Sequence, residues 1–85
     1  MSRLAKLVYK ILANPKHVSF ENLDKLLEEF GYERRQPRGG SSHYVYRKKG
    51  CKSITMPYKR PFVKEFYVKV VIRQLKLEEW YEKQG

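Results

Sequence analysis

The sequence lacks acidic residues over one long stretch: no aspartate or glutamate lies between Arg34 and Lys64. The same stretch holds ten lysines and arginines, whereas residues 1–33 carry five basic and five acidic side chains and residues 65–85 carry four of each. The net charge of +10 therefore resides in one segment. A field concentrated in this way favours a polyanionic partner. We expect that partner to be nucleic acid.

Cysteine and long apolar runs are also scarce. Cys51 is the only cysteine, which excludes an internal disulfide and favours a reduced, cytoplasmic setting. Lys6 and Lys10 interrupt the apolar positions near the N-terminus. The sequence therefore predicts neither a signal peptide nor a membrane span, and we expect no membrane partner.

The length and the apolar content indicate one folded domain. A chain of 85 residues cannot support two separate cores. Its hydrophobic content of 41% and aromatic content of 14% are enough for one core and argue against disorder. We expect a single domain over residues 1–85.

Helical periodicity occurs in the first 31 residues and again near the end. Apolar residues at helical spacing predict a helix over residues 2–13, and Ser19 is a suitable N-cap for a second helix that Gly31 would end. A further helix is predicted over residues 64–76, and a last helical turn over residues 78–83, anchored by Trp80.

The central residues favour strands. Residues 32–36, 43–47 and 52–56 are extended in character, separated by a glycine- and serine-rich turn over 37–42 and a tight turn at 49–50. The predicted fold class is α+β, in the order α-α-β-β-β-α, with helices packed on one face of a three-stranded antiparallel sheet. The other face would be available for binding.

The strand at 43–47 has two faces. His43, Val45 and Arg47 share one, and Tyr44 and Tyr46 share the other. The sequence alone leaves open which face is the core. Tyrosines on an uncovered face would stack on unpaired bases, although tyrosine in a small sheet more often packs in or near the core.

His43 has three possible roles. A metal-ligand role is unsupported, because His17 is distant in sequence, Cys51 is alone and the basic stretch contains no carboxylate, so we expect no metal and no cofactor. A structural role would make it a turn residue capped by Ser41 or Ser42. In a catalytic role it would activate a ribose 2′-hydroxyl toward the adjacent phosphorus, a reaction that needs neither metal nor carboxylate.

The region from Val18 to Leu75 combines several motifs that together resemble one family. The motifs are the helical pattern Phe20-x-x-Leu23-x-x-Leu26-Leu27-x-x-Phe30-Gly31-Tyr32, the pair Arg35-Gln36, the element Gly40-Ser41-Ser42-His43-Tyr44-Val45-Tyr46, the pair Met56-Pro57 and the run Tyr67-Val68-Lys69. In this combination the chain resembles the HicA toxins, also called YcfA-like proteins, of type II toxin–antitoxin systems. Two features depart from the family pattern: Ser42 extends its Gly-Ser-His motif, and Tyr58-Lys59 follows Pro57 where many members have a histidine.

The resemblance implies a fold similar to the double-stranded RNA-binding domain, with residues 1–13 as an additional N-terminal helix. It also implies a metal-independent endoribonuclease, an mRNA interferase, in which His43 is the catalytic general acid and base. The family usually acts opposite a HicB antitoxin, so the expected partners are mRNA and a HicB-type protein.

The basic stretch supplies the expected RNA contacts. The residues predicted to bind RNA are Arg34, Arg35, Arg38, Ser41, Ser42, Tyr44, Arg47, Lys48, Lys49, Lys59 and Arg60. The alternative function is a non-catalytic RNA-binding domain of the same shape, which would differ only in the role of His43. A protein that binds DNA through its last helix is disfavoured, because Glu65, Glu78 and Glu79 flank that helix.

Overall fold

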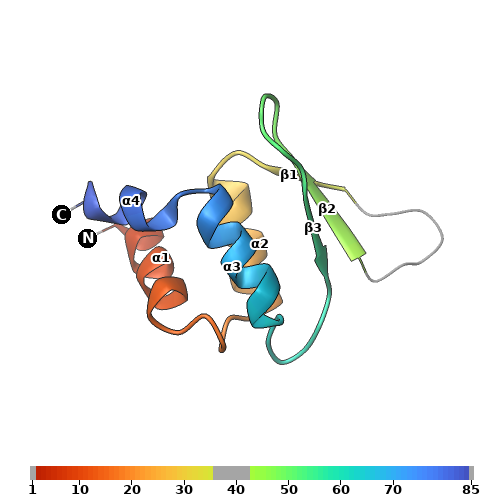
Figure 1. The fold of residues 1–85 in the computed structure, drawn as a ribbon, viewed down its shortest axis with the longest axis horizontal. Coiled ribbons are helices and arrows are strands. Elements are labelled where there is room, and N and C mark those ends of the chain that lie inside the picture. The colour runs from red at the N-terminus through yellow and green to blue at the C-terminus, as the bar shows by residue number, and fades with distance from the viewer. Residues whose placement is uncertain (1, 36–42, 85) are drawn as a thin grey trace.

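The computed structural model describes residues 2–35 and 43–84. The elements, in chain order, are α1 (Arg3–Ala13), α2 (Phe20–Glu29), β1 (Glu33–Arg35), β2 (His43–Arg47), β3 (Ile54–Pro57), α3 (Glu65–Gln74) and α4 (Leu77–Glu82) (Figure 1). The predicted α+β class is confirmed. None of the helices described is long and apolar enough to span a bilayer.

The three strands form one antiparallel sheet in the order β1-β2-β3. Figure 1 shows the helices on one side of this sheet, with α2 and α3 next to it and the pair of α1 and α4 farther away. The opposite face of the sheet is not covered by any helix of the described residues. The basic hairpin between β2 and β3 extends beyond the helices.

The hydrophobic core joins the helices to the inner face of the sheet. Tyr46, Ile54 and Met56 enter it from the strands, and each is at most 3% exposed. Residues from all the helices join the same cluster, including Val8 of α1 and Leu77 of α4. Helix α1 is therefore an integral part of the core rather than an appendage.

Local hydrogen bonds explain where α2 begins and ends. The Ser19 hydroxyl accepts a hydrogen bond from Asn22 N at 3.2 Å, which confirms the predicted N-cap. At the other end, Gly31 adopts φ +92°, and the amides of Gly31 and Tyr32 donate to the carbonyls of Glu28 and Leu27. This paired arrangement is a Schellman motif. Because it engages the Tyr32 amide, β1 begins at Glu33 and not at residue 32 as predicted.

The end of the chain contains both predicted helical segments, with bounds that differ by one or two residues. Helix α3 stops at Gln74, and α4 is a separate helix that begins at Leu77. Lys76 lies between them with φ 51°, a left-handed conformation that costs a non-glycine residue about 1–2 kcal/mol. Leu77 is fully buried immediately after this bend. Burial of Leu77 offsets the strain, and it anchors α4 together with the half-buried Trp80, which packs against Phe30.

Candidate nucleic-acid interface

The burial of Tyr46 shows which face of the sheet is the core. Tyr46 is 1% exposed and lies opposite Ile54, which is 3% exposed. Because side chains alternate along a strand, His43, Val45 and Arg47 point away from the helices. We name this side the open face. Together with their cross-strand partners, its residues are Glu33, Arg35, His43, Val45, Arg47, Thr55 and Pro57.

His43 is the first residue of β2, and it is exposed. Its cross-strand partner on β3 is Pro57. On the other side, Arg35 of β1 lies opposite Val45, which makes it a diagonal neighbour of His43. Diagonal neighbours are about 7–8 Å apart, within reach of a long side chain. The sheet thus places an imidazole and a guanidinium on one solvent-facing surface.

Arg47 extends this surface toward the hairpin. It lies four residues beyond His43 on the same face, at a distance of about 14 Å along the strand. Its cross-strand partner is Glu33, whose carboxylate also accepts a hydrogen bond of 3.4 Å from Arg35. The side chains of Arg35 and Glu33 are 68% and 76% exposed, so this ion pair is weak and a phosphate can replace the carboxylate.

Arg34 lies on the helix side of the sheet. Its Nη1 donates to Asp24 Oδ1 at 3.2 Å, and the Tyr46 hydroxyl donates to the same oxygen at 2.7 Å. The pKa of Tyr46 is raised, first by burial and then by its hydrogen bond to Asp24. Two acids from outside the basic stretch, Asp24 and Glu33, therefore reach its arginines, so the surface is less uniformly basic than the sequence indicated.

Tyr44 also lies on the helix side and is half-buried. Its ring is 5.2 Å from that of Phe20, and the guanidinium of Arg34 lies 5.4 Å from its centroid. The tyrosines of β2 thus belong to the packed face, which is the more common of the two alternatives considered for them. Tyr44 does not share a face with His43.

The two neighbouring lysines of the hairpin differ in their environment. Lys48 Nζ donates to the Phe30 carbonyl at 2.7 Å and lies 5.7 Å from the centroid of the Tyr32 ring. It therefore caps the C-terminal end of α2, where a cation is favourable. Lys49 is exposed at the turn before Gly50, whose φ of +79° confirms the predicted tight turn.

The basic loop after β3 lies at the same end of the sheet as His43. Tyr58 follows Pro57, and its ring packs 4.9 Å from that of Phe20. Arg60 Nε donates to the Tyr58 hydroxyl, and the guanidinium carbon lies 5.6 Å from the ring centroid. Lys59 and Arg60 are exposed. Tyr58 thus orients Arg60.

The remaining predicted contacts, Arg38, Ser41 and Ser42, lie outside the described residues. The sequence interpretation missed two residues that border the site. They are Glu33 and Thr55. Thr55 is exposed on the open face opposite Val45, and the alternation of β3 was the only signal for it.

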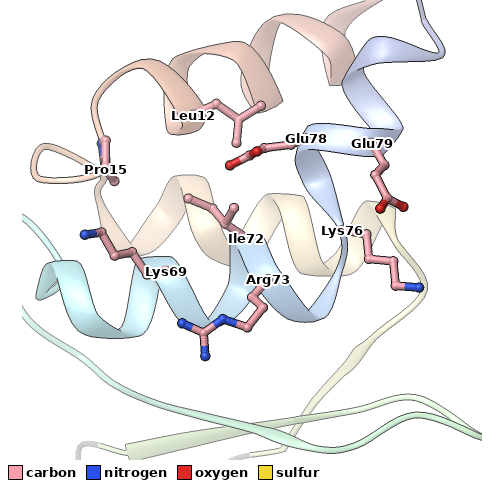
Figure 2. A pocket seen from close by; sticks show the side chains of 8 residues that line it. All are labelled: Leu12, Pro15, Lys69, Ile72, Arg73, Lys76, Glu78 and Glu79. Atoms are coloured by element: carbon pink, nitrogen blue, oxygen red, sulfur yellow. The ribbon is translucent and has the colours of Figure 1, made fainter.

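A cavity of about 460 Å³ lies elsewhere, among the ends of α1, α3 and α4 (Figure 2). Figure 2 shows the Glu78 carboxylate between Leu12 and Ile72, with Arg73 pointing away from it. None of the residues predicted to bind RNA lines this cavity. Over residues 2–35 and 43–84, no three His, Cys, Asp or Glu side chains gather as metal ligands do.

Comparisons of the chain with protein-family models, with curated proteins and with solved structures gave no significant match. The residues of the open face and the motifs of the sequence are therefore the features that indicate a function.

Proposed function

We propose that this protein is an RNA-cleaving toxin of the HicA type, a metal-independent endoribonuclease with a fold like that of the double-stranded RNA-binding domain. The observation that carries the proposal is the position of His43, exposed at the start of β2 on the open face with Arg35 as its diagonal neighbour. A general base can activate the ribose 2′-hydroxyl, and a neighbouring cation can stabilise the negative charge that develops on the phosphate.

The reaction uses the RNA as its own nucleophile. The imidazole of His43 accepts the proton of a ribose 2′-hydroxyl, and the 2′-oxygen forms a bond to the adjacent phosphorus. The bond from phosphorus to the 5′-oxygen breaks, and that oxygen takes up the proton held by the His43 imidazole. The products are a 2′,3′-cyclic phosphate and a 5′-hydroxyl end. Arg35 stabilises the negative charge that develops on the phosphate oxygens.

The other exposed cations hold the strand in register. Arg47 and Lys49 lie toward the hairpin, and Lys59 and Arg60 lie toward the end of the sheet that carries His43. Cations at both ends contact phosphates along an RNA that crosses the open face, and such contacts position the strand without reading its sequence. A HicB-type antitoxin with acidic groups would compete for the same cations and cover His43.

The test compares the two histidines of the chain. His43→Ala should lower the cleavage rate of a defined RNA by at least about 10²-fold, because one general base is removed. His17→Ala is the matched control, since His17 Nδ1 is paired with Asn14 Oδ1 at 3.0 Å in the connection between α1 and α2. It should cleave at the parental rate. A substrate with 2′-deoxyribose at the cut site should bind and remain intact.

The competing function is RNA binding without catalysis. It would be established if the parent bound RNA and left it intact. Cleavage by His43→Ala at the parental rate would exclude His43 as the catalytic base and overturn the proposed mechanism. Cutting of the 2′-deoxy substrate would exclude the 2′-hydroxyl as nucleophile and overturn the mechanism.

A further inference from the structure

The N-terminal flank has no net charge, but its charges are segregated. Residues 1–20 contain only basic charged side chains, and all five acids of the flank follow Phe20. Helix α1 itself carries Arg3, Lys6 and Lys10 and no acid. This helix lies at the end of the molecule away from the sheet (Figure 1). The protein therefore has a second cationic surface, remote from the open face.

An aromatic pair lies within this surface. Tyr9 of α1 is 55% exposed, and its ring centroid is 5.9 Å from that of Tyr81 of α4, with the planes tilted by 37°. Lys6, Tyr9, Lys10 and Tyr81 line an open groove of about 400 Å³. We name it the α1–α4 groove. Among the described residues, no carboxylate contributes to its lining.

Packing within the protein does not account for these side chains. Tyr9 is one of three large apolar side chains that the described part of the chain leaves exposed. Neither Lys6 nor Lys10 forms an ion pair with any described residue. Both lysines lie on the same side of α1 as Tyr9, at positions three before and one after it. The groove thus combines an accessible aromatic face with two neighbouring cations.

We propose that the α1–α4 groove binds single-stranded nucleic acid, with a base stacked against Tyr9 and neighbouring phosphates on Lys6 and Lys10. Aromatic rings accept any base, and lysines beside them follow the backbone, which is the usual composition of single-strand sites. An acidic protein segment would engage the lysines but leave the exposed face of Tyr9 uncovered. A stable protein interface also needs about 800 Å² on each partner, far more than one exposed tyrosine offers.

Binding in the α1–α4 groove does not depend on catalysis by His43. It assigns a binding surface to the helix that the resemblance to HicA treated as additional. Bound at both places, a long RNA would contact the open face and the α1–α4 groove at opposite ends of the molecule.

The experiment measures binding of a labelled single-stranded RNA of about 10 nucleotides. Full-length His43→Ala protein is used so that the probe stays intact. Tyr9→Leu should weaken binding about 5-fold or more, which is the lower end of the stacking contribution. Tyr9→Phe keeps the ring and should bind like the parent. Lys6→Gln with Lys10→Gln should reduce the slope of log affinity against log salt by about 1.4.

The matched control for charge is Lys16→Gln with Lys25→Gln, two exposed lysines outside the groove. This control should leave the salt slope nearly unchanged. Thermal melts of each variant report folding, and Tyr9→Phe separates loss of the ring from loss of stability. Cleavage by the parent is measured separately, so a failure of this inference is distinguishable from a failure of the proposed catalysis.

Three results would overturn the inference. The first is that Tyr9→Leu binds RNA as tightly as the parent. The second is that the Lys16 and Lys25 control loses as much salt dependence as the groove variant. The third is that Tyr9→Leu weakens binding of a polyglutamate peptide by the same factor as RNA, which would identify the groove as a site for an acidic protein segment.

Discussion

The Tyr46 hydroxyl donates a hydrogen bond to Asp24 from a side chain that is almost completely buried. Tyr46→Phe removes this bond to a charged acceptor, while Asp24 keeps its pairing with Arg34. We expect the variant to lose about 1–2 kcal/mol of unfolding free energy near neutral pH. For a domain of this size, that corresponds to a decrease in Tm of about 4–8 °C per kcal/mol.

The pH dependence gives the same residue a second test. The pKa of Tyr46 is raised above its ordinary value of 10.0, so the unfolded chain loses this proton first as the pH rises. The contribution of Tyr46 to the free energy of unfolding is therefore fully present below pH 10.0. Above that pH it falls by about 1.4 kcal/mol per pH unit. The free energies of unfolding of the parent and of Tyr46→Phe, measured by denaturation, should converge in alkaline solution. A stability difference that stays the same at alkaline pH would contradict the raised pKa of Tyr46.

At the scale of elements, the end of α2 and the β2–β3 hairpin are coupled through Lys48. Lys48→Gln should lower the unfolding free energy by about 0.5–1 kcal/mol, because the cation at the helix C-terminus is lost from an exposed site. Its RNA affinity should stay close to that of the parent, since the ammonium is engaged by Phe30. Urea denaturation and RNA titration of the same sample test both statements.

Lys49→Gln is the matched control, because Lys49 carries the same charge one residue away at the exposed turn. It should lose RNA affinity and keep its stability. The reverse pattern, with Lys48→Gln weakening RNA binding at unchanged stability, would place Lys48 in the interface and remove its role as a cap.

At the scale of the whole molecule, the net charge of +10 should make RNA binding strongly dependent on salt. Each neutralised phosphate contributes a slope of about −0.7 on a single strand, so the slope counts the contacts. Arg47→Glu with Lys49→Glu should weaken binding to all RNA sequences alike and reduce the slope. Fluorescence titrations between about 50 and 200 mM salt measure it. Binding that barely changes with salt, or that survives this reversal, would exclude the basic stretch as the RNA site.

The sequence determined the features that depend on neighbouring residues. Ser19 caps α2 through an amide three residues away, and Gly50 allows the turn after Lys49 because it has no Cβ. The alternation of β2 likewise placed His43 and Arg47 on one face. These outcomes require only local hydrogen bonds and local sterics, which the residue types themselves specify.

Only the tertiary structure decided which face is the core, because that depends on burial of Tyr46 against helices distant in sequence. Distance in sequence also hid the acids that reach the basic stretch, since Asp24 meets Arg34 only once β1 lies beside α2. The bend at Lys76 has the same origin. No local preference favours a left-handed lysine, and burial of Leu77 in the shared core selects it.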